Sequence, residues 1–231
     1  MHKLLVFDLD GTLAAVGKGM PKKAIKILQE LEKIGYQIAI CSGKTTFYLC
    51  GFMRQIGLLN PILIGENGAN IQFGIDLPPK KFHIYPYSKK ARRQIGLAKT
   101  LIEDVVGGDV WIQPNLVGYT PFPKSEEEFE KIETVLDARK EELDEVIIYR
   151  HVDSFDITPK EINKYNGLRY LSELTGIKAE EMVAFGDGVN DIPMFGYVDY
   201  AIGIGNRLSK EADMCFDDIE EALAYVIENR I

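Results

Sequence analysis

The chain of 231 residues can hold one or two domains, because most domains contain about 50–250 residues. Its hydrophobic fraction of 46% and charged fraction of 27% are ordinary for a soluble globular protein, and its net charge of −8 argues against a general nucleic-acid binder. The three cysteines form no CxxC pair, so we expect reduced thiols in a cytoplasmic protein, not disulfides or a zinc site. The N-terminal apolar run is too short for a signal peptide, and no run reaches the ~20 residues that would span a bilayer.

The first predicted element is a buried strand that ends in two carboxylates. Leu4–Phe7 is wholly apolar, which is typical of a strand buried on both faces of a parallel sheet. Asp8 and Asp10 follow it, and Gly11 and Thr12 come next. Open α/β sheets bind their ligands at the carboxyl ends of their strands, so these acids stand at a candidate site. An acidic turn that merely closes the strand would use the same residue types.

Helices and strands then alternate as far as residue 68. The spacing of Ala24, Leu28 and Leu31 predicts a helix over 20–34, which Gly35 ends. The next predicted elements are a strand over 37–41, a helix over 46–56 and a strand over 61–64. This β-α-β-α-β order predicts a parallel sheet wrapped by helices.

The pattern changes after a short strand over 71–73, and Pro78-Pro79 marks the expected exit from the first domain. The predicted helices beyond this point cover 89–106 and 126–143, and the predicted strands cover 82–85, 110–113, 117–122, 146–150 and 155–158. After the strand over 82–85, the α-β-β-α-β-β order suits a small antiparallel sheet covered by two helices. We therefore predict an inserted α+β domain, a cap, over 80–158.

The first pattern returns after Pro159. The predicted helices cover 166–175 and 219–228, and the predicted strands cover 182–185, 200–204 and 214–216. Residues 1–79 and 159–231 would then form one doubly wound, Rossmann-like α/β core that the cap interrupts.

The predicted core gathers polar residues at one edge, because parallel strands present their carboxyl ends together. Asp8 and Asp10 would meet the Ser42-Gly43 turn and the segment 186–191 there. Carboxylates gathered in this way repel one another unless a cation neutralises them, and oxygen ligands without His or Cys suit Mg²⁺. Lys164, just before a predicted helix, could add a positive charge. Such a set of groups is typical of a phosphoryl-transfer site.

These residues resemble the four ordered motifs of the haloacid dehalogenase (HAD) superfamily. The motifs are Asp8-Leu9-Asp10-Gly11-Thr12, Ser42, Lys164 and Gly186-Asp187-Gly188-Val189-Asn190-Asp191. The insertion between the second and third motifs resembles the C2 (IIB-like) cap of Cof-type phosphatases, and Glu66-Asn67-Gly68-Ala69 is similar to a further signature of that branch. The resemblance covers essentially the whole chain and implies a phosphatase with Mg²⁺ as its cofactor.

The resemblance also implies a role for each motif residue. Asp8 would be the nucleophile that forms an aspartyl phosphate, Asp10 the general acid and base, and Lys164 the bridge between Asp8 and the phosphoryl group. The implied phosphate-binding residues are Ser42, Gly43, Lys164 and Asn190. The implied metal ligands are Asp8, Asp10 through its backbone carbonyl, Asp187, and Asp191 either as a ligand or in the outer shell.

One tetrapeptide departs from the Cof-type pattern. Relatives of that branch often carry Thr-Gly-Arg at the second motif, where this chain has Ser42-Gly43-Lys44-Thr45. The variant resembles the motif of mannosyl-3-phosphoglycerate and sucrose-phosphate phosphatases, but it does not fix a substrate and leaves the role of Lys44 open. A Walker A loop is excluded, because Ile38 stands where that motif requires glycine.

The predicted cap offers candidates for substrate selection. Between Asp76 and Glu103 the chain has no acid but many basic residues, which indicates either a patch for an anionic substrate or an ordinary solvated face. Side chains alternate across a strand, so only some of the polar and aromatic residues on cap strands can face one ligand. The candidates are Trp111, Gln113, Tyr119 and His151.

We therefore expect a Mg²⁺-dependent phosphomonoesterase that acts on a small soluble phosphorylated metabolite, either a sugar phosphate or a phosphoglycolate-like acid. A phosphomutase of the same superfamily is the nearest alternative, and a phospho-acceptor signalling module or a non-catalytic binding module is more remote. The expected partner is the metabolite, with no nucleic acid and no membrane. The sequence leaves the physiological substrate and the oligomeric state open.

Overall fold

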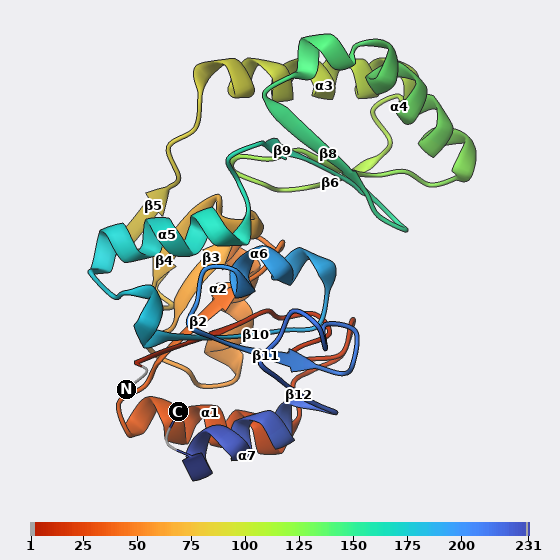
Figure 1. The fold of residues 1–231 in the computed structure, drawn as a ribbon. Coiled ribbons are helices and arrows are strands. Elements are labelled where there is room, and N and C mark those ends of the chain that lie inside the picture. Colours follow the sequence, from red (N-terminus) through yellow and green to blue (C-terminus); the bar gives the residue numbers. More distant parts are fainter. Residues whose placement is uncertain (1–2, 230) are drawn as a thin grey trace. The chain divides into compact units, whose positions relative to one another are not determined.

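The computed structural model describes residues 3–229 and 231, and the chain divides into two compact units (Figure 1). One unit, the core, extends to Tyr85 and resumes at Asn163, and the other, the cap, covers Pro86–Ile162. Both boundaries lie later in the chain than residues 79 and 158. The first is later because β5 (Lys81–Ile84) pairs antiparallel with β4 (Asn70–Phe73) of the core sheet. The expected placement of strand 82–85 in the inserted domain is therefore wrong.

The core is built on an eight-stranded sheet in the order β12-β11-β10-β1-β2-β3-β4-β5. Its remaining strands are β1 (Leu4–Phe7), β2 (Gln37–Cys41), β3 (Ile62–Gly65), β10 (Met182–Gly186), β11 (Tyr200–Ile204) and β12 (Met214–Phe216). Every pairing from β12 to β3 is parallel, whereas β4 and β5 pair antiparallel at one edge. This is the predicted Rossmann-like α/β fold, with β1 between β10 and β2.

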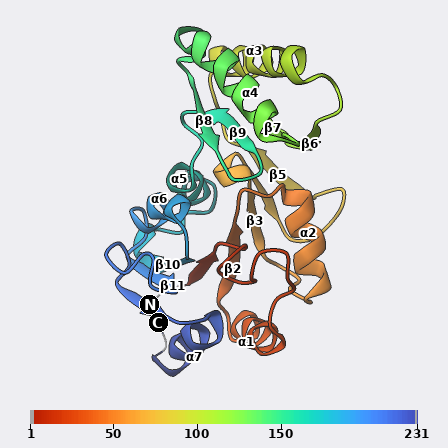
Figure 2. The same cartoon turned by 90° about the vertical axis from the view of Figure 1, so that its right-hand side faces the viewer.

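The apolar run of β1 is buried on both faces, as its sequence predicts, and all four of its side chains are inaccessible to solvent. Leu5 and Phe7 belong to one hydrophobic cluster, and Leu4 and Val6 belong to the other. The first cluster includes residues of α1 (Lys22–Lys33), α2 (Thr46–Gln55) and α7 (Ile219–Asn229), and the second includes residues of α5 (Lys164–Thr175) and α6 (Ile192–Phe195) (Figure 2). Burial of each large apolar side chain contributes about 1.5–3 kcal/mol, so this strand anchors the core.

The cap has the predicted α-β-β-α-β-β order. Its elements are α3 (Lys89–Val106), β6 (Trp111–Gln113), β7 (Thr120–Phe122), α4 (Glu126–Ala138), β8 (Val146–Arg150) and β9 (Phe155–Pro159). Two antiparallel hairpins, β6-β7 and β8-β9, are joined where Tyr119 and Ile157 exchange backbone hydrogen bonds of 2.9 and 3.0 Å. The helix predicted to run to residue 143 ends at Ala138, and the 3₁₀ helix η2 (Lys140–Leu143) follows.

Among the helices of the described residues, none is both long enough and apolar enough to cross a membrane.

Candidate active site

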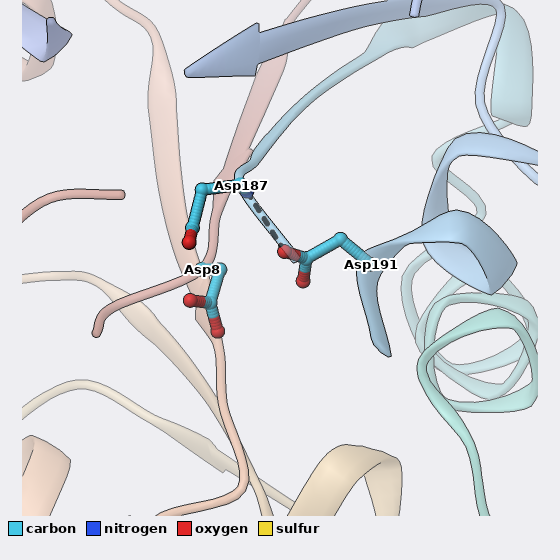
Figure 3. Close-up of side chains that lie close together, drawn as sticks. All are labelled: Asp8, Asp187 and Asp191. Atoms are coloured by element: carbon cyan, nitrogen blue, oxygen red, sulfur yellow. Dashed lines mark hydrogen bonds between the residues drawn. The ribbon is translucent and has the colours of Figure 1, made fainter. Parts of the chain in front are cut away.

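Three aspartates converge at the carboxyl ends of two adjacent strands of the core sheet (Figure 3). Asp8 directly follows β1, and Asp187 and Asp191 follow β10, which pairs with β1 in parallel register. One carboxylate oxygen from each of the three residues lies within 4.8 Å of the others. Residues far apart in the sequence therefore meet because their strands end at the same edge, as the sequence predicts.

Lys164 joins two of these carboxylates at the start of α5. Its Nζ atom lies 2.6 Å from Asp8 Oδ1 and 2.5 Å from Asp191 Oδ1, and its side chain is only 1% exposed. The helix begins at this residue because Asn163 caps it, with Asn163 Oδ1 accepting a hydrogen bond of 2.9 Å from the backbone N–H of Asn166. A buried ammonium is stable only when it is paired, and here two carboxylates pair with it.

Burial shifts the pKa values of the charged groups in this cluster. It raises the pKa of Asp8 to about 6, although the ammonium of Lys164 acts in the opposite direction. Burial alone would lower the pKa of Lys164, but the carboxylates of Asp8 and Asp191 reverse this effect and hold that pKa above its ordinary value. Burial also raises the pKa of Asp187. The lysine is therefore charged, whereas full ionisation of Asp8 and Asp187 calls for further positive charge.

Asp191 organises the turn that carries Asp187. Its Oδ2 atom accepts hydrogen bonds of 3.0 Å from the backbone N–H groups of Asp187 and Gly188, and its Oδ1 atom accepts from Lys164. The residue is completely buried. Both of its carboxylate oxygens thus have protein donors, which favours the outer-shell role over direct coordination of a metal.

Thr12 supports Asp187 from the first motif. The Thr12 hydroxyl donates a hydrogen bond of 2.9 Å to Asp187 Oδ1 and opposes the rise of the Asp187 pKa. The sequence placed Thr12 in a motif but gave it no role, because its partner lies in a distant segment.

Gly11 allows the turn after β1 to pass directly over Asp187. Its φ is +95°, and a Cβ atom added there would lie 2.6 Å from Asp187 Cγ. We expect Gly11→Ala to lower the free energy of unfolding by about 2–3 kcal/mol, since the left-handed backbone and the displaced carboxylate both add cost. Urea denaturation measures this loss.

Gly17→Ala is the matched control for that prediction. Gly17 also has a positive φ, +70°, but nothing lies within 4 Å of an added Cβ atom. Gly17→Ala should therefore lower the free energy of unfolding only by the backbone contribution of about 1 kcal/mol. Equal losses at the two positions would show that the close approach to Asp187 contributes nothing.

The second motif forms a turn between β2 and α2. Ser42 is buried and its backbone N–H donates to the carbonyl of Ile64 at 3.0 Å, while the N–H of Lys44 donates to Ser42 Oγ at 3.3 Å. Thr45 then caps α2 by accepting from the N–H of Tyr48 at 3.3 Å. The turn thus holds Ser42 and Gly43 at the same sheet edge as Asp8.

Asp10 and Lys44 form an ion pair at this edge, with 3.6 Å between Asp10 Oδ2 and Lys44 Nζ. The side chain of Asp10 is therefore paired with Lys44, whereas the carboxylate cluster comprises Asp8, Asp187 and Asp191. No local sequence pattern predicts this pair, because the two residues come from different turns.

The 3₁₀ helix η1 (Glu66–Gly68) supports the second-motif turn. The backbone N–H of Glu66 donates to the carbonyl of Lys44, and that of Asn67 donates to the carbonyl of Ser42, both at 2.9 Å. Glu66 and Asn67 have φ values of 51° and 56°, a left-handed conformation that is uncommon for residues with a Cβ atom. The sequence identified 66–69 only as a family signature, whereas the structure shows that its backbone N–H groups hold the second-motif turn in place.

Asn190 occupies an exposed position in η4 (Val189–Asp191), beside Gly188. Its side chain is not part of the buried cluster formed by Asp8, Lys164 and Asp191. Cys41, at the end of β2, is buried with a pKa raised to about 12 by burial, so its thiol stays protonated.

The cap candidates fall into different environments. Tyr119 is buried in the hydrophobic cluster of the cap, whereas Trp111 is 59% exposed and packs edge-on against Phe122. Gln113 donates a hydrogen bond of 2.6 Å to Asn115 Oδ1, and His151 Nε2 lies 3.2 Å from Asp156 Oδ2. Part of the basic run is neutralised within the cap, since Lys90 pairs with Asp144 and Lys99 with Glu103.

Comparison with known proteins identifies the family. The profile of haloacid dehalogenase-like hydrolases matches residues 5–89 and 115–227, which is most of the chain. The chain belongs to the haloacid dehalogenase-like hydrolase family. It is therefore an enzyme of the hydrolase class, as the four motifs predicted.

Individual proteins are similar to this chain in sequence or in fold over more than nine-tenths of its length. The chain is 27% identical over 230 residues to a phosphoglycolate phosphatase from Methanopyrus kandleri, covering 94% of this chain and 91% of that protein. Its fold is similar to a haloacid dehalogenase-like hydrolase from Bacteroides thetaiotaomicron, with a TM-score of 0.82, 17% identity and coverage of 98% and 100%. It is also similar to a HAD subclass IIB sugar phosphatase, with a TM-score of 0.71, 23% identity and coverage of 96% and 98%.

Proposed function

We propose that this enzyme is a divalent-metal-dependent phosphomonoesterase that hydrolyses a small phosphorylated metabolite through an aspartyl phosphate on Asp8. The observation that carries the proposal is the buried Asp8–Lys164–Asp191 cluster at the strand edge, with Asp187 beside it and Asp10 close by in the chain. A relative named as a phosphoglycolate phosphatase and a structural neighbour named as a sugar phosphatase support a small phosphorylated acid or sugar as the substrate.

The residues present fit a hard divalent cation such as Mg²⁺. Carboxylate oxygens of Asp8 and Asp187 and the backbone carbonyl of Asp10 would hold it, since Mg²⁺ binds to one or two carboxylates together with substrate phosphate and water. When bound, the ion supplies positive charge to the transferring phosphoryl group. Asp191 would act indirectly, by holding Lys164 and the turn that carries Asp187.

In the first chemical step, a carboxylate oxygen of Asp8 attacks phosphorus and the bond from phosphorus to the leaving oxygen breaks. Asp10 donates its proton to that leaving oxygen, which departs as an alcohol. Lys164 favours the ionised form of Asp8 and offsets the charge of the phosphoryl oxygens. The hydroxyl of Ser42 and the N–H of Gly43 donate to those oxygens.

In the second step, Asp10 acts as a base. Its carboxylate takes a proton from water while the water oxygen attacks phosphorus, and the bond between phosphorus and Asp8 breaks. The products are inorganic phosphate and a free Asp8 carboxylate, and Asp10 is protonated again. The enzyme is thereby ready for the next substrate molecule.

The test is phosphate release from a panel of sugar phosphates, phosphoglycolate and an aryl phosphate, before and after removal of metal. We expect chelation to abolish release and Mg²⁺ to restore it. Since the pKa of Asp8 is raised to about 6, Asp8 gains a proton as the pH falls through that value. Apparent Mg²⁺ affinity, and with it activity at limiting Mg²⁺, should therefore decline below about pH 6, because a proton on Asp8 competes with the metal and blocks attack on phosphorus.

Release that survives complete metal removal would contradict the proposal. Conversion of a hexose 1-phosphate into the 6-phosphate, with little free phosphate, would instead indicate a phosphomutase.

A further inference from the structure

We propose that Lys44 contacts the leaving group and selects phosphomonoesters that carry a negative charge next to the ester oxygen, such as phosphates of 2-hydroxy acids. This inference rests on the proposed phosphomonoesterase function and adds a substrate class to it. The position of Lys44, the rigidity of its backbone and the exposure of its charge each support the inference.

The ammonium of Lys44 lies beside the group that must touch the leaving oxygen. Its Nζ atom is 3.6 Å from Asp10 Oδ2. To protonate the leaving oxygen, the carboxyl of Asp10 must approach it to about 2.6–3.2 Å. A cation next to Asp10 therefore faces the first atoms of the leaving group. In phosphoglycolate, a single methylene separates the carboxylate from the ester oxygen, so that carboxylate falls within reach of Lys44.

The backbone of Lys44 is fixed on both sides of the residue. Its N–H donates to Ser42 Oγ at 3.3 Å, and its carbonyl accepts from the N–H of Glu66 at 2.9 Å. Thr45, the next residue, caps α2. The loop therefore fixes where the side chain starts, while its flexible four-carbon stem lets the ammonium follow a ligand.

The two lysines of the site differ in how far their charges are already satisfied. Lys164 is 1% exposed and bridges two buried carboxylates, so its ammonium is already paired and is not available to a charged leaving group. Lys44 is 40% exposed and its partner Asp10 is 31% exposed. Partly exposed ion pairs of this kind are weak, so Lys44 can share or exchange Asp10 for a substrate carboxylate at little cost.

Charge next to the ester oxygen can be tested with two matched substrates. Phosphoglycolate carries a carboxylate, and glycolamide phosphate carries a neutral carboxamide of nearly the same size. We expect the wild type to prefer phosphoglycolate. Lys44→Met should lower kcat/KM for phosphoglycolate about 10- to 100-fold more than for glycolamide phosphate, since it removes a charge-assisted contact. Lys44→Arg keeps the charge and should keep most of the preference.

Lys26→Met is the matched control, because Lys26 is an exposed lysine on α1 of the same unit. Lys26→Met should change kcat/KM for neither phosphoglycolate nor glycolamide phosphate. If Lys44→Met lowers both rates equally, Lys44 only positions Asp10, and the inference is overturned. An unchanged preference in Lys44→Met overturns it as well.

A binding measurement separates this inference from the proposed function. Titration calorimetry with Asp8→Asn and Asp8→Asn/Lys44→Met compares the affinities for phosphoglycolate and glycolamide phosphate without turnover. A selective loss of phosphoglycolate affinity in the double variant supports the role of Lys44. Wild-type protein that releases phosphate from no substrate in the panel would refute the phosphomonoesterase, whereas equal Kd values for the two ligands in Asp8→Asn would refute the role of Lys44.

Discussion

Asp8→Asn is expected to abolish hydrolysis of every phosphomonoester, with a loss of at least about a thousandfold in kcat. The amide that replaces the carboxylate is a poor nucleophile and a poor ligand for a hard cation. Lys164 keeps its pairing with Asp191, 2.5 Å away, so the buried ammonium is still compensated. Phosphate release from an aryl phosphate at saturating Mg²⁺ measures the loss.

The same variant should keep or gain stability at neutral pH. Because burial raises the pKa of Asp8 from 3.8 to about 6, this group stabilises the fold below about pH 3.8 and loses that contribution as the pH rises through 6. Above pH 6 the buried charge therefore opposes folding, and the neutral amide removes that effect. Thermal denaturation tests this expectation.

Asp76→Asn is the matched control for Asp8→Asn, since Asp76 belongs to the core unit and forms an exposed ion pair with Lys80. It should leave turnover unchanged. If Asp8→Asn retained Mg²⁺-dependent turnover, the nucleophile would have to be another group.

Lys164→Met is expected to have the largest effect on stability, lowering the free energy of unfolding by about 3–5 kcal/mol. The substitution keeps most of the apolar stem but leaves Asp8 and Asp191 buried without their shared counter-charge. Turnover should also be lost, because the cation that favours ionised Asp8 is absent. Urea denaturation at neutral pH measures the stability, and phosphate release measures the turnover.

Acid should partly rescue the stability of this variant. Protonation of Asp8, whose pKa burial already raises, removes one of the unpaired buried charges, so the difference from wild type should shrink as the pH is lowered. Lys44→Met serves as the comparison, since its partly exposed ion pair should contribute only about 0–1 kcal/mol. Two results would contradict a stabilising ion bridge between Lys164 and the two aspartates. One is a loss of unfolding free energy in Lys164→Met no larger than that in Lys44→Met, and the other is a loss that does not depend on pH.

Much of the fold can be predicted from local patterns in the sequence, and β1 illustrates why. A run of buried apolar residues that ends in acids can be read without any knowledge of distant residues, and the strand lies where it was expected. The placement of β5 could not be read in this way. Its residues Lys81–Ile84 carry an ordinary strand signal, and only their backbone pairing with β4 assigns them to the core.

The candidate site likewise contains features that local sequence patterns predict and features that they do not. The sequence predicts that Asp8, Asp187 and Asp191 lie close together, because each follows a strand and parallel strands end at the same edge of a sheet. Local patterns could not predict the contact between Lys44 and Asp10, or the hydrogen bonds from Glu66 and Asn67 to the second-motif turn. These depend on how separate turns fold over one another, which has no periodic signature.

The central position of β1 also has a consequence for the order in which the protein is made. Leu4 pairs with Gln37 on one side and with Met182 on the other, and the whole cap is encoded between these two partners. During synthesis, β1 remains an apolar strand with one open edge until β10 emerges, and open edges of this kind invite pairing with other chains. Asp187 directly follows β10 and Asp191 lies in η4 just beyond it, so the step that closes the open edge also completes the acidic cluster. A nascent chain therefore closes this edge of β1 and completes the cluster of Asp8, Asp187 and Asp191 at the same stage of its synthesis.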